Sequence, residues 1–278
     1  MTAIILHTVV VIAIFKSPNM KSCYGYLTLT LFLSDNVYVF SCTYFLNIRV
    51  YYPYLFDEPL IQLLDAIVPP TSFIFDRVYL LCHLFLSINR FLSIYMPINY
   101  KLIFSKNNTR LLMFFIILAP MISILPMFFV DHCNLIFNEE YETFIVLTNF
   151  CSQLQIAFLH AYFIYFTGSV CFVLDIFVLK KLFHIKKGQT GINENVRWLD
   201  QSENRYAISC ISLNFLLILN MIFQTYLFQN KIIFRIQAII YYIAQPAIFF
   251  ICNGDVRQFT TKMFFKQAKT SSKVTVIR

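Results

Sequence analysis

Residues 110–130 read RLLMFFIILAPMISILPMFFV, a largely apolar run whose one charged side chain stands at its first position. A helix rises about 1.5 Å per residue, so a run of this length reaches across a hydrocarbon core of about 30 Å. The run therefore predicts a helix that spans a membrane.

Six other apolar stretches flank this one, and polar residues separate them. The seven stretches cover about 2–15, 24–47, 70–95, 110–130, 154–179, 206–228 and 232–252. Only the first falls short of a full span, at about 21 Å of helix, so the bilayer thins there, flanking residues extend the helix, or the chain lacks its true N-terminus. We predict a single all-α transmembrane domain of seven helices over residues 1–278.

The composition agrees with a membrane protein. Hydrophobic residues make up 59% of the chain, charged residues make up 13%, and the mean hydropathy is +0.67. Soluble domains carry about 25% charged residues. A bilayer accommodates this much apolar surface, whereas a globular core does not.

The basic residues predict the orientation of the chain. Of the 22 Lys and Arg residues, all but Arg49, Arg77, Lys231 and Arg235 lie in or beside the connections at 16–23, 96–109 and 180–205 or the tail. Cytoplasmic loops are rich in basic residues, so we expect the N-terminus outside and a basic cytoplasmic tail with a short amphipathic helix at 253–278. This spread over several short segments argues against a nucleic-acid partner. No basic residue precedes the first apolar stretch, which disfavours a signal peptide.

The ionisable residues inside predicted spans include Asp35, Asp76, Arg77 and His83. A charge at the centre of a span costs at least about 2.5–3.5 kcal/mol, so each needs a partner or water. Adjacent residues on a helix point about 100° apart, so Asp76 and Arg77 do not pair well, whereas His83 lies on the face of Asp76. We expect a polar stripe facing the bundle interior, serving either as a ligand pocket or as structural hydrogen bonding between helices. Asp35 alternatively reaches water near a helix end.

The eight cysteines include Cys133 and Cys151, both in the predicted second outer loop. A disulfide between them would contribute about 3 kcal/mol on the oxidising side of the membrane. No CxxC pair or Cys and His cluster is present, so we predict no metal site and no cofactor.

Residues 87–100 read SINRFLSIYMPINY and look like the inner end of the third helix in rhodopsin-like receptors. The seventh stretch supports the likeness, because Gln245-Pro246-Ala247-Ile248-Phe249 resembles their Asn-Pro-x-x-Tyr motif. Asp35 stands where such receptors carry an acidic residue in the second helix. The resemblance implies a helix switch at Asp35, Gln245, Pro246 and Phe249. It also implies a G-protein contact at Arg90, Asn89, Tyr100 and Lys181.

The chain is more similar to the nematode serpentine chemoreceptors of class X. The likeness rests on Asp76, His83, Asn89, Arg90, Phe91, Pro97, Tyr100 and Phe104, with Asp175, Lys180 and Lys181 at the end of the fifth stretch. It implies a chemosensory receptor in the plasma membrane, with sensory cilia as a candidate location. Such a receptor would bind a small molecule in the outer half of the bundle and activate a heterotrimeric G protein.

The sequence departs from the rhodopsin-like pattern at Asn89, which replaces the acid that would restrain Arg90, and this predicts a weaker inactive state. No cysteine in 48–70 ties the third helix to the second outer loop. Two alternatives stay open: a transporter or channel that uses Asp35, Asp76 and Arg77, and a truncated receptor that does not signal. An enzyme is disfavoured, because no nucleophile and base pair or phosphate loop is present.

Overall fold

The computed structural model spans residues 1–278. It describes residues 2–17, 21–43, 49, 51–55, 57–129, 135–138, 143–146, 150–154, 162–188, 207–220, 222, 231–254 and 256–261. The described part is mostly helical. Its helices are α1 (Thr2–Lys16), α2 (Cys23–Thr43), a 3-10 turn η3 (Pro53–Leu55), α3 (Glu58–Tyr95), α4 (Pro97–Ile103), α5 (Lys106–Phe129), α6 (Phe150–Gln153), α7 (Phe163–Gly188), Ala207–Asn220, α9 (Lys231–Cys252) and 256–261.

Each of the seven predicted stretches overlaps one of these helices. Within the described residues, three helices are long and apolar enough to cross a membrane: Glu58–Tyr95, Lys106–Phe129 and Phe163–His184. Three further apolar helices are shorter: Ile4–Lys16, Ala207–Asn220 and Ile239–Cys252. The helical membrane architecture is therefore confirmed in its coarse form, while the number of crossings and the orientation remain predictions.

The expectation of an all-α chain is wrong in one place. Strands β1 (Leu135–Asn138) and β2 (Thr143–Val146) form a two-stranded antiparallel sheet, in which Leu135 pairs with Val146 and Asn138 with Thr143. Their sequences, LIFN and TFIV, contain β-branched and aromatic residues, which favour strands. The connection of residues 139–142 is short enough for a hairpin.

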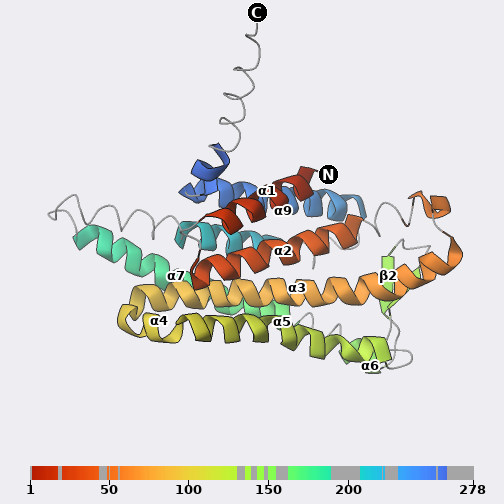
Figure 1. The fold of residues 1–278 in the computed structure, drawn as a ribbon, viewed down its shortest axis with the longest axis horizontal. Coiled ribbons are helices and arrows are strands. Elements are labelled where there is room, and N and C mark those ends of the chain that lie inside the picture. The colour runs from red at the N-terminus through yellow and green to blue at the C-terminus, as the bar shows by residue number, and fades with distance from the viewer. Residues whose placement is uncertain are drawn as a thin grey trace, which may run out of the picture.

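Helix α3 is the centre of the fold. It packs against α2, α5 and α7, while α1 packs against α2 and α9. Figure 1 shows α3 as the long middle helix, with α2, α1 and α9 on one side and α4 and α5 on the other. The helix begins at Glu58, well before the predicted span, and has Pro59 in its first turn, where proline is well tolerated. It runs on through Pro69 and Pro70.

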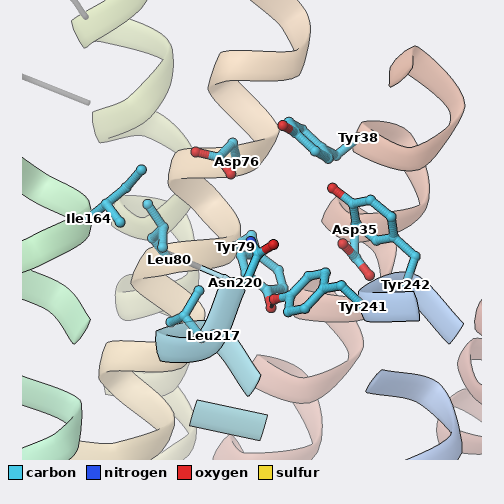
Figure 2. Close-up of a pocket in the computed structure, with 10 residues that line it drawn as sticks. All are labelled: Asp35, Tyr38, Asp76, Tyr79, Leu80, Ile164, Leu217, Asn220, Tyr241 and Tyr242. Carbon is cyan, nitrogen blue, oxygen red and sulfur yellow. Dashed lines mark hydrogen bonds between the residues drawn. The ribbon is translucent and has the colours of Figure 1, made fainter. Parts of the chain in front are cut away.

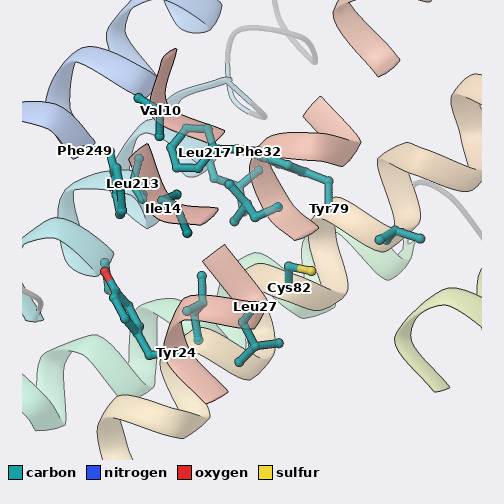
Figure 3. Packing of buried hydrophobic residues seen from close by; sticks show 14 of the residues in the cluster. Val10, Ile14, Tyr24, Leu27, Phe32, Tyr79, Cys82, Leu213, Leu217 and Phe249 are labelled. Atoms are coloured by element: carbon teal, nitrogen blue, oxygen red, sulfur yellow. The ribbon is translucent and has the colours of Figure 1, made fainter. Parts of the chain in front are cut away.

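The largest buried apolar cluster joins α1, α2, α3, Ala207–Asn220 and α9. Figure 3 shows Val10, Phe32, Tyr79, Leu213 and Phe249 meeting in this cluster from five separate helices. Large apolar side chains also cover the outside of the bundle, and on α5 they are exposed at Leu111, Phe114, Phe115 and Phe129. An apolar exterior of this kind suits contact with lipid.

Candidate functional site

A small cavity lies between α2, α3, α7, Ala207–Asn220 and α9, and its volume is about 40 Å³. Its walls carry two carboxylates, four tyrosines, one amide and three aliphatic side chains: Asp35, Asp76, Tyr38, Tyr79, Tyr241, Tyr242, Asn220, Leu80, Ile164 and Leu217. Figure 2 shows Asp76 on α3 across from Asp35 and Tyr38 on α2, with Tyr79 and Tyr241 meeting beside them. Two of the intramembrane acids noted in the sequence thus line one space.

His7 on α1 contacts both α9 and α2 beside this cavity. Its Nε2–H donates to the carbonyl oxygen of Tyr242 at 3.0 Å, and the same nitrogen lies 3.1 Å from Oδ2 of Asp35. The second contact lacks the angles of a hydrogen bond, since Oδ2 has no hydrogen-bond partner within the described residues. A neutral imidazole protonated on Nε2 is sufficient for both contacts. The Asp35 carboxylate therefore lies near the Nε2–H of His7, and this contact does not require His7 to be positively charged.

A set of buried contacts leads away from the cavity along α3. The hydroxyls of Tyr79 and Tyr241 share a short hydrogen bond, and the Tyr79 ring meets the His83 ring edge to face, with 4.5 Å between centroids. His83 Nδ1–H donates to Oδ1 of Asn214 at 2.7 Å. His83 thus connects the cavity wall to the helix Ala207–Asn220.

Asn214 is the hub of a polar network in the middle of the bundle, with 2% of its surface exposed. Its Nδ2 donates to Ser87 Oγ at 2.7 Å and to Asp175 Oδ2 at 2.8 Å. Together with the His83 bond, these contacts join three helices, α3, α7 and Ala207–Asn220. Buried polar groups of this kind are costly unless their hydrogen bonds are made, so the network favours one arrangement of the three helices.

Arg77 points away from the cavity that its neighbour Asp76 lines. It is only 4% exposed, and one guanidinium nitrogen donates to Ser123 Oγ on α5 at 2.5 Å. Ser123 in turn donates to the carbonyl oxygen of Pro120 at 2.8 Å. Arg77 and Ser123 belong to a separate, mostly apolar cleft of about 210 Å³. The structure does not bring Asp76, Arg77 and His83 together into one stripe.

Arg90 is enclosed near the C-terminal end of α3, with 7% of its surface exposed. Its guanidinium carbon lies 4.0 Å from the centre of the Tyr24 ring on α2. Its side chain also hydrogen-bonds to Cys210 on the helix Ala207–Asn220. An aromatic face attracts a cation, and more strongly when water is excluded. The Arg therefore lies against a ring and a thiol.

Asn89 contacts a different helix from Arg90. Its Nδ2 donates to the hydroxyl of Tyr100 on α4 at 3.3 Å. The Tyr95 hydroxyl donates to the carbonyl oxygen of Phe177 on α7 at 2.9 Å, and the ammonium of Lys181 lies 5.9 Å from the centre of the Tyr95 ring. The predicted coupling residues Asn89, Arg90, Tyr100 and Lys181 thus gather at one end of α3, although Arg90 faces α2.

The predicted switch residues of α9 lie in the buried part of the bundle. Phe249 is fully buried and packs edge to face on Phe32 of α2, with 4.9 Å between ring centroids. Gln245 is also buried, and neither its amide nitrogen nor its amide oxygen has a hydrogen-bond partner in the part of the chain that the structure describes. Pro246 lies inside α9. Asp35 belongs to the cavity wall one turn along α2 from Phe32.

Only part of the predicted disulfide lies within the described residues. Cys151 is in a disulfide, whereas Cys133 lies outside the described residues, so their pairing remains a prediction. Over the described ranges, no group of three or more His, Cys, Asp or Glu side chains is arranged to hold a metal ion.

Sequence reasoning missed His7, Tyr24, Asn214 and the cavity tyrosines as site residues. Asn214 carried a usable signal, because it is an amide within an apolar stretch. The tyrosines carried little signal, since 17 occur along the chain and their meeting depends on helix packing.

The bundle of apolar helices with buried charges around a small cavity has the features of a membrane receptor. The family model described as serpentine type 7TM GPCR chemoreceptor Srx matches residues 2–265. The chain therefore belongs to the Srx family of serpentine chemoreceptors, which confirms the resemblance to class X, and this family is not an enzyme class. No curated protein matches the chain.

Proposed function

We propose that this protein is a seven-transmembrane chemosensory receptor that binds a small molecule within its bundle and activates a heterotrimeric G protein. The N-terminus lies outside and the tail in the cytoplasm, in the plasma membrane, with sensory cilia as a candidate location. The observation that carries the proposal is Arg90, a buried arginine at the end of α3 in a chain of this family. Burying a cation is costly, so a buried arginine is expected to have a function. Contact with the G protein in one of two conformations of the receptor would be such a function.

The polar contacts suggest a route between the cavity and Arg90. The Tyr79 and His83 rings touch, His83 binds Asn214, and Cys210, which contacts Arg90, lies one helical turn from Asn214. A shift of the helix Ala207–Asn220 would loosen Arg90 from Cys210 and expose its guanidinium. A ligand drives this shift only through its differential affinity for the two states.

In this mechanism the other predicted residues have supporting roles. Asn89, Tyr100 and Lys181 border the surface that receives the G protein, and Asp35, Gln245, Pro246 and Phe249 hold α9 against α2. Asp76 lines the cavity and His83 contacts its wall, so both belong to the proposed ligand site. Arg77 lies at the other cleft and is connected to this site only through the backbone of α3. Cys133 and Cys151 would close the second outer loop.

The transporter alternative receives less support. An ion path would need Asp35, Asp76 and Arg77 along one channel, but Arg77 belongs to a different cleft from the two acids.

The direct test measures nucleotide exchange on a G protein that is reconstituted with the full chain in membranes, over a panel of small odorants. Ligand-dependent exchange is expected for the wild type and is expected to vanish for Arg90→Ala. Arg49→Ala is the matched control. Arg49 pairs with Asp65 at 3.2 Å, and both residues are predicted to lie on the outer side of the membrane. Ion pairs of this kind contribute little to stability. Equal exchange by wild type and Arg90→Ala would refute the role of Arg90. Silence of the wild type at the cell surface would refute the receptor function.

A further inference from the structure

We propose that the cleft between α3, α5 and α7 is a second binding site, which takes a small neutral aromatic molecule dissolved in the membrane. The cleft is separate from the cavity at Asp35 and Asp76, so the proposal goes beyond the receptor function above. Three features support it: the depth of the cleft in the membrane, the composition of its walls and the guanidinium group of Arg77.

The cleft lies at the middle of a predicted membrane span. Ala119, Pro120 and Ser123 form its α5 wall, and they occupy the centre of the apolar run at 110–130. Ala119 is exposed on the outside of α5, as is Phe115 one turn earlier. Because lipid hydrocarbon surrounds a span at this depth, a molecule dissolved in the bilayer can reach the cleft directly.

The walls and the volume of the cleft suit an apolar ring. Leu81, Ala119, Pro120 and Phe163 provide aliphatic and aromatic surface, and the volume is about 210 Å³. For comparison, an apolar cavity of about 150 Å³ in another protein binds benzene. The cleft therefore has room for a benzene ring with a small substituent.

The guanidinium group of Arg77 favours an aromatic ring over an aliphatic one. Arg77 and Ser123 both line the cleft, and their hydrogen bond of 2.5 Å places the guanidinium at its wall. Aromatic faces attract a guanidinium, most strongly where water is excluded. An aliphatic ring of the same size lacks this attraction.

This attraction is compatible with the partners that Arg77 already has. Ser123 accepts a hydrogen bond from one of its nitrogens, and Asp76 interacts electrostatically with the cation. The N–H groups lie in the plane of a guanidinium, whereas an aromatic ring stacks on its face, so the ring does not compete for them. Since Asp76 offsets the charge of Arg77, the site does not require an anionic ligand, and a neutral molecule enters the bilayer at far lower cost.

Binding is measured with the full chain in lipid nanodiscs by fluorine NMR, with fluorobenzene as the probe. Empty nanodiscs of the same lipid give the signal of probe dissolved in the bilayer, and the protein is expected to add a saturable bound signal. Toluene is expected to displace the probe at a bilayer concentration roughly 2- to 30-fold lower than methylcyclohexane, because only toluene is attracted to the guanidinium. Benzoate is the anionic control and is expected to displace the probe less than toluene does.

Two variants on α5 locate the site. Ala119→Phe fills the cleft and is expected to abolish the bound signal. Ile122→Phe is the matched control, because it adds the same ring to the same helix at a position that is 56% exposed. Ile122 is not among the described residues that line the cleft, so the bound signal is expected to persist.

Arg77→Gln tests the chemistry of recognition. The amide keeps a planar group that can hydrogen-bond to Ser123, but it removes the positive charge. The preference for toluene over methylcyclohexane is expected to disappear, because the attraction of the aromatic face needs the cation. If this variant does not fold, the preference measured on the wild type and the result for Ala119→Phe decide.

Several results would overturn the proposal. These are a fluorobenzene spectrum that the protein leaves unchanged, and a bound signal that Ala119→Phe retains. Equal displacement by toluene and methylcyclohexane would show that the cleft takes any hydrocarbon, a lipid chain included, and would refute the aromatic class. Stronger displacement by benzoate than by toluene would assign the cleft to anions instead. No G protein is present in these measurements, so their failure leaves the receptor function standing, and a lack of nucleotide exchange leaves the aromatic site standing.

Discussion

The middle of α3, at Asp76, and its C-terminal end, at Arg90, bury ionisable side chains in opposite ways. Around Asp76 the bundle leaves a cavity with several polar groups on its walls, whereas around Arg90 a ring, a thiol and packed side chains enclose the cation. A cavity can accept a ligand without moving helices, but an enclosed arginine can reach a partner only if a helix moves. From this difference we propose that the first region serves recognition and the second serves restraint.

Loss of Phe249 is expected to have the largest effect on stability. Phe249→Ala opens a hole against Phe32 in the buried apolar cluster, at a cost of about 3–5 kcal/mol. The thermal unfolding midpoint in nanodiscs measures it. Phe115→Ala is the control, because Phe115 is 54% exposed on the outside of α5, and it should change the midpoint much less. Equal losses would mean that the region around Phe249 is not tightly packed.

Asn214 connects the two regions. We expect its replacement to have the second largest effect on stability. Asn214→Ala leaves His83, Ser87 and Asp175 without this partner, so we expect a loss of about 2–3 kcal/mol. Ligand-dependent nucleotide exchange should fall as well, because the route to Cys210 is cut. The control Asn108→Ala removes an exposed amide that binds the Leu102 carbonyl. Full ligand response in Asn214→Ala would exclude the proposed route.

The restraint on Arg90 is tested at Tyr24. Tyr24→Leu removes the aromatic face, worth about 0.5–2 kcal/mol, and should raise nucleotide exchange without ligand by up to about 30-fold. Tyr24→Phe keeps the ring and should retain low basal exchange. A rise in both variants would assign the restraint to the hydroxyl instead of the ring.

The smallest expected effect is at Tyr100. Tyr100→Phe removes one hydrogen bond of 3.3 Å to Asn89, worth about 0.5–1 kcal/mol, so stability should fall slightly and basal exchange should stay low. The measurements are the unfolding midpoint and exchange without ligand, beside Tyr24→Leu. A rise in basal exchange as large as that of Tyr24→Leu would move the restraint from Tyr24 to the pair of Asn89 and Tyr100.

The sequence alone determined the helical membrane architecture, because the length and apolarity of a span are local properties. It located the intramembrane charges for the same reason, and the segment around Arg90 was specific enough to indicate the receptor family. It overlooked the β1 and β2 hairpin, since two strands of four residues leave little periodicity to detect.

Only the tertiary structure decided which partner each buried polar group has. Arg77 meets Ser123 across 46 positions, His83 meets Asn214 across 131, Tyr79 meets Tyr241 across 162, and His7 meets Tyr242 across 235. Local pattern predicts that a buried charge needs a partner, but the partner depends on how distant helices pack. For this reason Asp76 faces the cavity, whereas Arg77, the next residue in the chain, faces a separate cleft.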